Sequence, residues 1–548
     1  MKTLEGLALR RLVQEIEKDI TGTRVQKITF PTDWETSLDL FGASKTLALL
    51  VSTHPECSAI ALLPSPEKGN PPKTPWQKLL HKYLVGGKIV SFRQVGWDRV
   101  IEVVFHNPGL WEKETEFVCV LELTGRNANL ILTRNDPQRT ILGALRTVSP
   151  EENRFRSILP GLPYTPPPQR ERHDPLEFSG NPVFPEAHDL VQWCIRNLDG
   201  FGPFLAAAFA ELSERFGKED AFQRIVRPLT GECSFLVFLD HDDKPLGVFW
   251  EHVSSLSPFS SYPFPSLNEA MAFFLLTFRE YLLEATQRRI QERKLKEDLE
   301  FLRRELQKIE DLLPREEEVE LLRLKGELLK MFPHLEVLER TEEGIRVRNP
   351  FASSPEEIFI ALPPSRSLGE TMQEYFKQYR KMQERRTRLL KAWKELQGRF
   401  EKMQNLLTTS ERLEPLSGDT EFQKTSGGII RFRTPSGNEI WVGKNARANR
   451  VLVRIASRND YWLHARDFPG AHVIVKAFAP ETLEEDIEKA AQIAAYFSSG
   501  HLEGKVDVVC TQVKHLRVLP AKEGGKTTYR NEKTLRVAPS YPQDLQKI

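Results

Sequence analysis

Cysteine is scarce in this sequence. Five cysteines are scattered over 548 residues, at positions 57, 119, 194, 233 and 510, and none of them belongs to a CxxC pair. Disulfide frameworks and cysteine-based zinc sites both need closely spaced cysteines. The sequence therefore predicts a reduced, intracellular protein that has neither.

Long apolar runs and an excess of charge are also missing. No run is long enough to span a membrane. The first 20 residues alternate apolar and charged side chains at helical spacing, without the continuous apolar core of a signal peptide. A cytoplasmic location with no membrane partner is therefore the expectation. The chain has 77 Lys and Arg residues and 76 Asp and Glu residues, so the two signs nearly balance. Only the distribution of charge along the chain can therefore indicate an acidic partner.

What the chain has is length and two heptad patterns. Its 548 residues are too many for one core and predict three or four domains. In two segments, apolar residues recur in steps of three and four with charged residues between them, which is the seam of a coiled coil. The seams are Leu295, Leu299, Leu302, Leu306, Ile309 and Leu313, and Met372, Tyr375, Tyr379, Met382, Leu389, Trp393, Leu396, Phe400, Met403 and Leu407. Two seams in one chain predict an antiparallel coiled-coil hairpin, here within an arm at 263–420.

Local signals mark the ends of these two helices. Ser266 with Glu269, and Ser367 with Glu370, have the spacing of a capping box, in which each side chain satisfies an orphan amide at the helix start. Pro314 ends the first helix. Residues 314–366 add one more helix and a strand pair, so we expect a small tip domain there, whose contact the residues do not reveal. Arg386 breaks the second seam where an apolar residue is expected.

Residues 1–172 predict an α+β domain with short antiparallel strands. After an opening helix, strand-like runs are KTLALLVST, AIALL, KIVSFRQV, RVIEVVF, FVCVLEL and NLILT. Polar clusters interrupt them at Asp98 and Arg99, and at Glu122, Arg126 and Asn129. Such clusters can be turns, because Asp and Asn cap turns. They can also recognise nucleic acid. The planar guanidinium of Arg fits phosphates and base edges, and carboxylates can orient that guanidinium or accept hydrogen bonds from the exocyclic amines of bases. The spacing alone leaves both interpretations open.

Residues 173–262 predict a helix-hairpin-helix domain. Two helical segments flank the turn Asp199-Gly200-Phe201-Gly202. In a helix-hairpin-helix motif, glycines let backbone amides approach a phosphate at the start of the second helix, where the dipole favours an anion. We therefore predict a phosphate-binding hairpin at Gly200, Phe201 and Gly202, while a pure packing unit is the equally weighted alternative.

Residues 421–548 predict a last α+β domain with a basic surface. The stretch from Gly443 to Arg466 contains six Lys and Arg residues but only one acid, Asp460. Trp441, Tyr461 and Trp462 lie among or beside them, which favours phosphate binding combined with stacking on bases or riboses. A second basic set is Lys514, His515, Arg517, Lys522, Lys526, Arg530, Lys533 and Arg536. A metal or general-base site at Asp460, His464 and His472 is disfavoured, because the histidines lie among strand residues, where a structural hydrogen bond would satisfy them.

Several blocks along the chain are recognisable. In the last domain they are VGKNARAN, DYWLHARDFPGAHVIV, AAQIAAYFSSG and VKHLRVLPAKEGGKTTYRNEKTLRV, and before it they are YFKQYRKM, NPPKTPWQKLLHKYL, the WDR at 97–99 and ELTGRNANLIL. Together they resemble the NFACT family of ribosome quality-control factors: the first four are similar to its RNA-binding module, and the others are similar to its other blocks, in the same order. The family usually has Asn, Gln and an acid where this chain has Ala446, Ala448 and Arg450, and Ser where it has Ala471. The resemblance therefore implies no side-chain contact for this chain at those four positions. The chain ends soon after the module, as in bacterial members.

The resemblance implies a fold and a function. It implies an N-terminal domain similar to formamidopyrimidine DNA glycosylases, but this chain starts Met1-Lys2-Thr3 instead of with their catalytic Pro-Glu, so glycosylase chemistry is not expected. It implies tRNA recognition by that domain and binding of arm, tip and C-terminal module to the large ribosomal subunit. On a subunit obstructed by peptidyl-tRNA and a nascent chain, the protein would recruit alanyl-tRNA, and the ribosome would add C-terminal alanines. A small RNA-binding protein is a further candidate partner, and no catalytic residue, cofactor or metal is expected.

The site residues that follow form two sets. For tRNA they are Asp98, Arg99, Glu122, Arg126 and Asn129. For rRNA they are Trp441, Lys444, Asn445, Arg447, Asn449, Arg454, Trp462, His464, Arg466, His472, Lys514 and Arg517. Two other functions stay open. A fibronectin-binding surface adhesin is disfavoured by the arginine run and the lack of a signal peptide, and a nucleic-acid-processing enzyme would need a nucleophile or metal site that the sequence does not offer.

Overall fold

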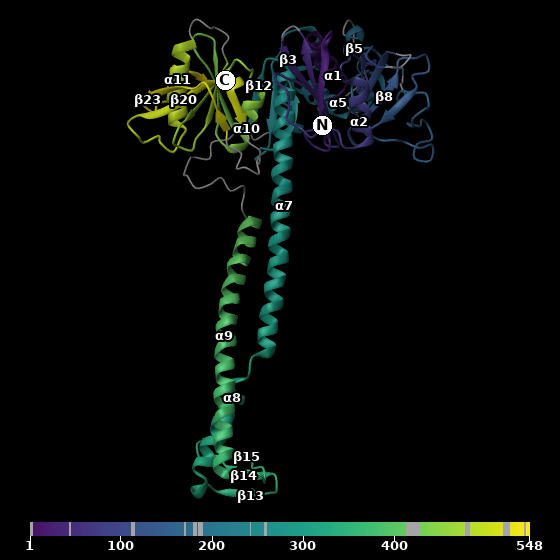
Figure 1. The fold of residues 1–548 in the computed structure, drawn as a ribbon. Coiled ribbons are helices and arrows are strands. Elements are labelled where there is room, and N and C mark those ends of the chain that lie inside the picture. Colours follow the sequence, from purple (N-terminus) through teal and green to yellow (C-terminus); the bar gives the residue numbers. More distant parts are fainter. Residues whose placement is uncertain are drawn as a thin grey trace. The chain divides into compact units, whose positions relative to one another are not determined.

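The computed structural model describes residues 4–42, 45–110, 115–168, 171–178, 184, 190–241, 243–256, 260–412, 428–476, 483–518, 527–541 and 544–547. The contacts within the chain divide it into two units (Figure 1), which are described separately. One unit is Met1–Leu283 with Ser417–Ile548, and the other is Glu284–Leu416.

A nine-stranded antiparallel sheet dominates the N-terminal part, in the order β4-β3-β2-β1-β5-β6-β7-β8-β9. The strands are β1 (Arg24–Thr29), β2 (Glu35–Gly42), β3 (Lys45–His54), β4 (Cys57–Leu63), β5 (Lys88–Gln94), β6 (Val100–His106), β7 (Glu116–Glu122), β8 (Asn129–Arg134) and β9 (Ile141–Ala144). The six predicted strands are confirmed as β3 to β8. The sequence patterns missed β1, β2 and β9. A short 3-10 helix, η1 (Gly125–Asn127), joins β7 to β8.

Two helices pack against this sheet. Helix α1 (Gly6–Ile20) buries Leu9, Leu12, Val13, Ile16 and Ile20, whose helical spacing forms one apolar face, and it contacts β5. Helix α2 (Pro75–Leu84) starts with a complete capping box between Thr74 and Gln77. These helices therefore close the core on one face of the sheet.

The following region contains helices and a second sheet. The helices are α3 (Pro175–Phe178), α4 (Leu190–Asn197), α5 (Pro203–Phe216) and α6 (Lys218–Thr230). The predicted helix, glycine turn and helix are present as α4 and α5. The sequence did not predict the three-stranded sheet, ordered β11-β10-β12, of β10 (Phe235–Leu239), β11 (Pro245–Phe249) and β12 (Ser260–Phe264). The 3-10 helix η3 (Ser254–Leu256) precedes β12.

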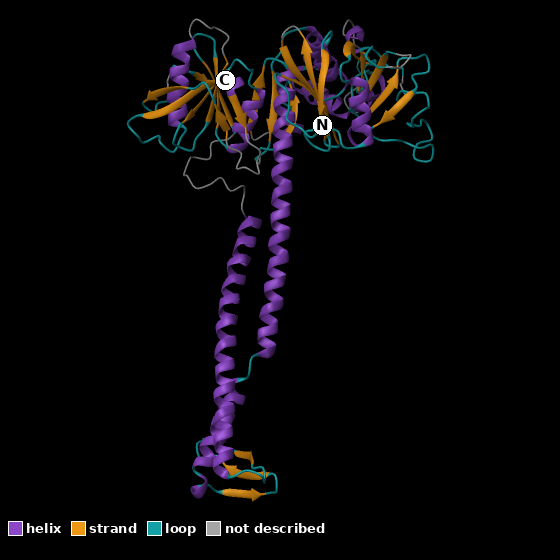
Figure 2. Ribbon diagram, in the orientation of Figure 1, coloured by secondary structure: helices purple, strands orange, loops and turns teal. Residues whose placement is uncertain are grey.

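The C-terminal domain has a seven-stranded sheet, ordered β23-β20-β18-β19-β17-β16-β24. Figure 2 draws strands in orange and helices in purple. Its strands are β16 (Ile429–Arg433), β17 (Glu439–Gly443), β18 (Tyr461–Ala465), β19 (His472–Lys476), β20 (Val506–Gln512), β23 (Lys533–Val537) and β24 (Gln546–Lys547). The helices are α10 (Ala446–Ile455), α11 (Leu483–Tyr496) and the 3-10 helix η6 (Val513–His515), and β21 (Leu516–Val518) pairs with β22 (Thr527–Tyr529). One face packs on α11, and the other joins the core of the N-terminal part through α10.

The second unit holds the long helices. Helix α7 (Leu267–Leu312) starts in the first unit, where Ala270 to Leu276 are buried, and ends in the second. The other elements are α8 (Glu316–Lys330), η4 (Phe332–His334), β13 (Val337–Arg340), β14 (Gly344–Arg348), β15 (Glu357–Ala361) and α9 (Leu368–Arg412). The tip core consists of α8, β14 and β15 together with Met372 and Tyr375 of α9.

Helix α9 runs antiparallel to the end of α7. Trp393 Nε1 donates to Glu310 at 3.0 Å, and the Arg385 guanidinium donates to the Leu312 carbonyl at 3.3 Å. The order of these partners is reversed along the two helices, as the hairpin prediction requires. Arg386, which interrupts the heptad seam, lies where α7 has ended: it donates to the Pro314 carbonyl at 3.2 Å and pairs with Glu316 at 2.8 Å.

The predicted helix starts differ in detail. At Ser367 the capping box is complete, because the Ser367 amide donates to Glu370 at 2.8 Å and the Glu370 amide donates to Ser367 Oγ at 3.3 Å. At Ser266 only the serine half is present. Glu15 of α1 also binds this helix start, since its carboxylate accepts from Ser266 Oγ at 2.7 Å and from the Asn268 amide at 2.8 Å. Helix α7 is therefore fixed to α1 by its first turn.

Candidate nucleic-acid interfaces

The predicted tRNA residues gather at one end of three neighbouring strands. Val100 of β6 pairs with Glu122 of β7, and Glu122 pairs with Asn129 of β8. The Leu123 amide donates to the Arg99 carbonyl at 2.8 Å, which extends this ladder by one residue. Because side chains alternate across a sheet, Glu122 and Asn129 point to the face opposite Arg99. The backbone therefore brings these residues together, but their side chains do not form one site.

The Asp98–Arg99 turn is held rigidly by its surroundings. Asp98 Oδ1 accepts from the Arg99 amide at 2.7 Å, and the Asp98 carbonyl accepts from Gln94 Nε2 at 2.7 Å. The Arg10 guanidinium lies 4.4 Å from the centre of the Trp97 ring. Trp97, Asp98 and Arg99 are all half-buried. The side chains of Asp98 and Arg99 thus lie on a fixed turn and still reach the surface.

The glycine hairpin packs directly behind this turn. A Cβ on Gly6 would lie 1.8 Å from the Trp97 carbonyl oxygen and 2.7 Å from Gly200 Cα, so this contact requires glycine. Trp97 Nε1 also donates to Asp174 Oδ2 at 3.0 Å. The start of α1, the Trp97 turn and the hairpin therefore interlock.

The hairpin amides that were predicted to bind phosphate already bind a carboxylate. Glu5 accepts from the amides of Gly202, Phe204 and Leu205 at 2.8, 2.9 and 2.9 Å. Phe201 is buried in the core. Burial raises the pKa of Glu5, while these amides and the charge of Arg99 oppose the shift. Glu5 thus takes the place of the phosphate expected at Gly200, Phe201 and Gly202, and the structure favours the packing alternative.

Glu122 is not available to an RNA base. It is fully buried, its two carboxylate oxygens each accept from Arg156 at 2.6 Å, and one of them also accepts from Tyr164 Oη at 2.9 Å. The hydrogen bond to Glu122 raises the pKa of Arg156. The expectation that Glu122 orients Arg99 or Arg126, or accepts from an exocyclic amine, is therefore corrected: it anchors the segment that carries Arg156.

Asn129 also has a structural role, whereas Arg126 is exposed. Asn129 is buried; its Nδ2 donates to the Arg146 carbonyl at 2.8 Å and its Oδ1 accepts from the Arg146 amide at 2.9 Å. Asn129 thus fixes the backbone of an arginine that the sequence analysis did not single out. Arg126 on η1 is exposed to solvent and remains a candidate RNA contact.

In the C-terminal domain, the two tryptophans predicted to stack on RNA are buried. Trp441 is 2% exposed and Trp462 is 1% exposed. The Trp441 ring lies under Arg431 and Lys476, at 4.5 and 4.2 Å, and its Nε1 donates to Glu439 at 2.8 Å. Neither tryptophan ring has a face open to a base. The prediction that Trp441 and Trp462 stack on RNA is therefore corrected: both residues belong to the core.

The arginines of α10 face the N-terminal part of the same unit. Arg450 Nε and Arg454 Nη1 donate to the two oxygens of the Glu280 carboxylate, both at 2.7 Å, and Glu280 is buried. Arg447 is buried as well, and its Nη1 donates to the Asp243 carbonyl at 3.3 Å. These arginines therefore fix the C-terminal domain to α7 and the β10–β11 turn.

The neighbouring asparagines hold α10 in place. Asn445 caps the helix, because its Oδ1 accepts from the Ala448 amide at 2.8 Å. Asn449 Oδ1 accepts from the His472 amide at 2.9 Å, and its Nδ2 donates to the Gly470 carbonyl at 3.3 Å. Lys444 is half-buried, and burial together with the charge of Lys547 lowers its pKa. The structure gives both asparagines a local role that is independent of RNA.

Burial disfavours the charged form of both histidines. Burial lowers the pKa of His464, and burial with the nearby His464 lowers the pKa of His472 to about 3. Their rings are 5.3 Å apart, and His464 stacks on Trp462 at 5.8 Å. Neutral imidazoles in this aromatic cluster do not supply charge for phosphate. Within the described residues, no group of three His, Cys, Asp or Glu side chains is placed to hold a metal ion.

The exposed positive charge lies at another part of the domain. Exposed cations there include Arg458, Arg466, Lys514, Arg530, Lys533 and Arg536. The Lys514 amide donates to the Arg458 carbonyl at 3.0 Å, and the Arg530 amide donates to the His515 carbonyl at 3.2 Å, so three chain segments converge there. We name Arg458, Lys514, Arg530 and Lys533 the basic surface. The side chain of Arg517, and Lys522 and Lys526, lie outside the described residues.

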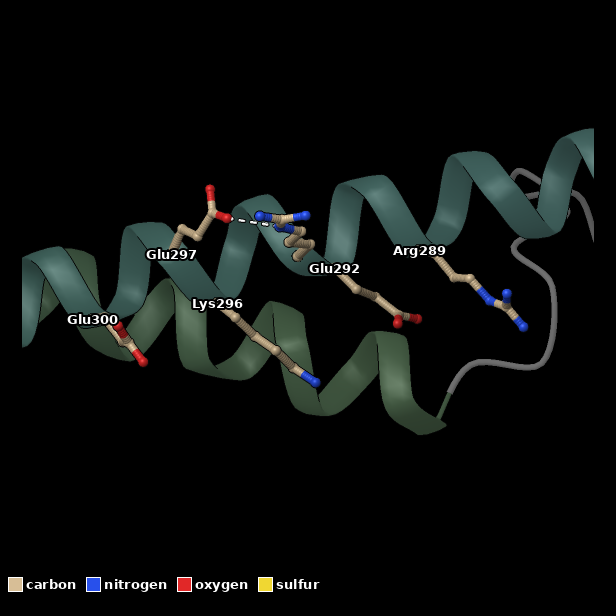
Figure 3. Close-up of a pocket in the computed structure, with 6 residues that line it drawn as sticks. Arg289, Glu292, Lys296, Glu297 and Glu300 are labelled. Carbon is tan, nitrogen blue, oxygen red and sulfur yellow. Dashed lines mark hydrogen bonds and ion pairs between the residues drawn. The ribbon is translucent and has the colours of Figure 1, made fainter.

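A groove of about 300 Å³ lies along α7 (Figure 3). It is lined by Arg289, Glu292, Arg293, Lys296, Glu297 and Glu300, and Arg293 pairs with Glu297 at 2.9 Å. All six side chains come from one helix, three of them positive and three negative. Such a pattern is typical of a solvated helix face and carries no converging chemistry.

Comparison with known proteins decides the family. The NFACT N-terminal and middle domains match residues 5–422, and the NFACT protein RNA binding domain matches residues 431–530. The chain belongs to the NFACT family. An Rqc2 homolog RqcH from Streptococcus pneumoniae serotype 2 (strain D39) is 26% identical over 569 residues, covering 98% of both chains. The Rqc2 homolog RqcH of Bacillus subtilis (strain 168) is 27% identical over 572 residues, again covering 98% of both.

A solved structure is also similar to this NFACT chain. The N-terminal part of the fibronectin/fibrinogen-binding protein from Streptococcus suis has 21% identity and a TM-score of 0.41, and it covers 50% of this chain and 99% of its own. No helix in the described part of the NFACT chain has both the length and the apolar character to cross a bilayer.

Proposed function

We propose that this protein is a ribosome-associated quality-control factor. It binds a large ribosomal subunit obstructed by peptidyl-tRNA and its nascent chain, and it recruits alanyl-tRNA for mRNA-independent alanine tailing that marks the stalled chain for degradation. Membership of the NFACT family and the two RqcH relatives, which match over 98% of their length, support the general role. The peptide bond is assigned to the ribosome, so no catalytic residue is proposed.

The Asp98–Arg99 turn carries the tRNA part of this proposal. Its backbone is fixed by Gln94 and by the packing of Gly6 on Trp97, while both side chains stay half-exposed. The Asp98 carboxylate can accept a hydrogen bond, and the planar Arg99 guanidinium beside it can donate several. Together they can bind one base, or a base and a neighbouring phosphate. Arg126 adds an exposed cation on the adjacent turn. Pre-organisation of this kind reduces the entropy lost on binding.

The basic surface is assigned to ribosomal RNA. Its side chains are solvent-exposed, whereas Arg447 is buried and Arg454 pairs with a buried carboxylate. Cations gain affinity for RNA by releasing counterions, which requires that they reach phosphates. Lys514 and Arg466 therefore keep their proposed rRNA role, and Arg458, Arg530 and Lys533 join them.

The test changes the turn and leaves the ribosome-binding surface unchanged. The double variant Asp98→Ala/Arg99→Ala is purified from lysates, and the same pull-down is divided between tRNA sequencing and subunit sedimentation. Each lost charge-assisted contact is expected to cost about 1.5–3 kcal/mol, which is tenfold or more in affinity. We therefore expect loss of tRNA and of alanine tails, with the large subunit retained.

A matched control is Arg93→Ala, because Arg93 is an exposed arginine on β5 of the same sheet. It should leave tRNA recovery unchanged. Normal tRNA recovery by a folded double variant would refute the tRNA role. A wild-type protein that retained fibronectin but neither ribosomal RNA nor tRNA would instead support the adhesin alternative.

A further inference from the structure

An exposed tryptophan lies close to the proposed tRNA turn. Trp34, between β1 and β2, is 41% exposed. The other tryptophans in the described part of the chain, at 76, 97, 193, 250, 393, 441 and 462, are buried or half-buried. Exposing this much apolar surface opposes folding, since apolar surface is stabilised by burial. Trp34 is therefore a candidate contact for a partner.

The position of Trp34 is fixed from several sides. Its carbonyl accepts from the Thr53 amide at 2.8 Å and from Thr53 Oγ1 at 3.0 Å, and its amide donates to Thr32 Oγ1 at 3.3 Å. The His54 ring meets the indole at 5.5 Å in an edge-on arrangement of 78°. The indole thus rests on a well-held backbone, and part of its surface stays uncovered.

A guanidinium accompanies the indole. Arg146 lies 5.7 Å from the centre of the Trp34 ring. Its backbone is held by both polar groups of the buried Asn129 side chain, and its Nη1 donates to the Arg126 carbonyl. The half-buried Arg146 guanidinium therefore lies between the exposed Trp34 ring and the backbone of Arg126, whose own side chain is exposed.

Hydrogen bonds connect this group to the Asp98–Arg99 turn. The Gly125 amide donates to Ser58 Oγ at 3.0 Å, and Ser58 Oγ donates to the Leu123 carbonyl at 3.3 Å. The Leu123 amide in turn donates to the Arg99 carbonyl at 2.8 Å. The β7–β8 turn is thus bonded to Arg99 on one side and to Arg146 on the other, so both groups border the same turn.

We propose that Trp34, flanked by Arg146, is a stacking site for an unpaired base of the RNA that the Asp98–Arg99 turn binds. This inference rests on the proposed tRNA-binding function. Unpaired bases expose a π-face that aromatic side chains and arginine planes stack on, whereas bases inside an A-form helix do not. The flanking arginines favour a polyanion over an apolar protein segment. Trp34 thereby adds affinity for an RNA loop that the Asp98–Arg99 turn recognises through hydrogen bonds.

The test compares a loop with a duplex, using the full-length protein. The probes are an RNA stem-loop that carries 2-aminopurine at single loop positions and a blunt RNA duplex of the same number of nucleotides. Trp34→Ala should weaken stem-loop binding roughly tenfold and abolish the quenching of 2-aminopurine at one position. Duplex binding and the salt dependence should stay unchanged, because no phosphate contact is lost. Trp34→Phe keeps a flat ring and should retain most of the affinity.

The possible outcomes separate the two proposals. Unchanged stem-loop affinity and quenching in Trp34→Ala overturn the stacking site, even if Asp98→Ala/Arg99→Ala still abolishes tRNA recovery. Equal losses in Trp34→Ala and Trp34→Phe together with a lowered melting temperature also overturn it, because they indicate a structural indole. If the Asp98–Arg99 variant keeps normal tRNA recovery, the proposed function fails independently of Trp34.

Discussion

Replacing Glu280 by Gln tests how the C-terminal domain is held in place. The buried Glu280 carboxylate on α7 accepts from Arg450 and Arg454 on α10, each at 2.7 Å. Glutamine keeps the shape of the side chain but removes the negative charge, so both arginines lose an ionic partner. We expect the packing of α10 on α7 to weaken, while each domain keeps its own fold.

The expected size follows from burial. A hydrogen bond to a charged group contributes about 1.5–3 kcal/mol, and removing one partner of a fully buried ion pair costs about 3–5 kcal/mol. Here Glu280 is 5% exposed but the two arginine side chains are 27% and 30% exposed, so water partly solvates the arginines left behind. We therefore expect about 2–3 kcal/mol for Glu280→Gln, near the lower end of these ranges.

Hydrogen–deuterium exchange of the full-length protein measures this effect locally, which suits a multidomain chain that does not unfold in two states. A cost of 2–3 kcal/mol corresponds to roughly 30- to 150-fold faster exchange over α10 and the first turns of α7. The control is Glu300→Gln on the same helix, where the pair with Arg304 is 73% and 74% exposed, and where we expect less than about 0.5 kcal/mol. Unchanged protection of α10 in Glu280→Gln would refute the reasoning.

Two more predictions concern charge. Changing Arg458, Lys514, Arg530 and Lys533 to Ala should weaken large-subunit binding and flatten the slope of its log–log salt dependence by about 0.7–0.9 per lost phosphate contact. The control Arg454→Ala should leave that slope unchanged. Equal slopes in all variants would contradict the assignment of the basic surface to ribosomal RNA. Burial raises the pKa of Asp39 to about 6, with Lys27 opposing and Glu67 adding to the shift. The folded protein thus binds this proton more tightly than the unfolded chain, and ionisation costs stability as pH rises from about 4 to 6. Asp39→Asn should therefore raise the local protection of β2 against hydrogen exchange at pH 7.5 by the equivalent of about 1–3 kcal/mol and flatten the pH dependence of that protection, and an unchanged pH dependence would contradict the prediction.

Local sequence patterns predicted the parts of the fold that depend on local physics. The long helices begin at Leu267 and Leu368, each one residue after the serine that marks the predicted start. The strands from β3 to β8 lie where β-branched and aromatic residues cluster. These features follow from side-chain spacing and capping, which neighbouring residues determine.

Long-range partners could not be predicted in the same way. Glu5 binds an amide 200 positions away, at Leu205, and Glu15 accepts from Ser266 Oγ at the start of α7 across 251 positions. Arg156 reaches Glu122 from a segment with no strand or helix pattern. Each pairing depends on how elements pack, so a local pattern shows that a carboxylate is present without showing which donor it meets.

The tryptophan predictions failed for a related reason. In an exposed sheet, alternation separates buried from exposed side chains, but a sheet covered on both faces buries every position. All five residues of β17 are buried, because α11 packs on one face and α10 with the N-terminal part packs on the other. Trp441 and Trp462 therefore look the same in sequence as aromatic residues on an open RNA-binding sheet.

The basic run near α10 joins two kinds of arginine that the sequence does not distinguish. Arg447, Arg450 and Arg454 are spaced by three and four residues, so helical periodicity places them on one face. That face meets Asp243 and Glu280 instead of solvent, which gives Arg450 a buried carboxylate as its partner. Arg458 follows the end of the helix and is exposed beside Lys514. The charge that holds the domain to α7 is thus separate from the charge free to meet RNA, and for that reason Arg454→Ala and Lys514→Ala should differ in their effect on the salt dependence of ribosome binding.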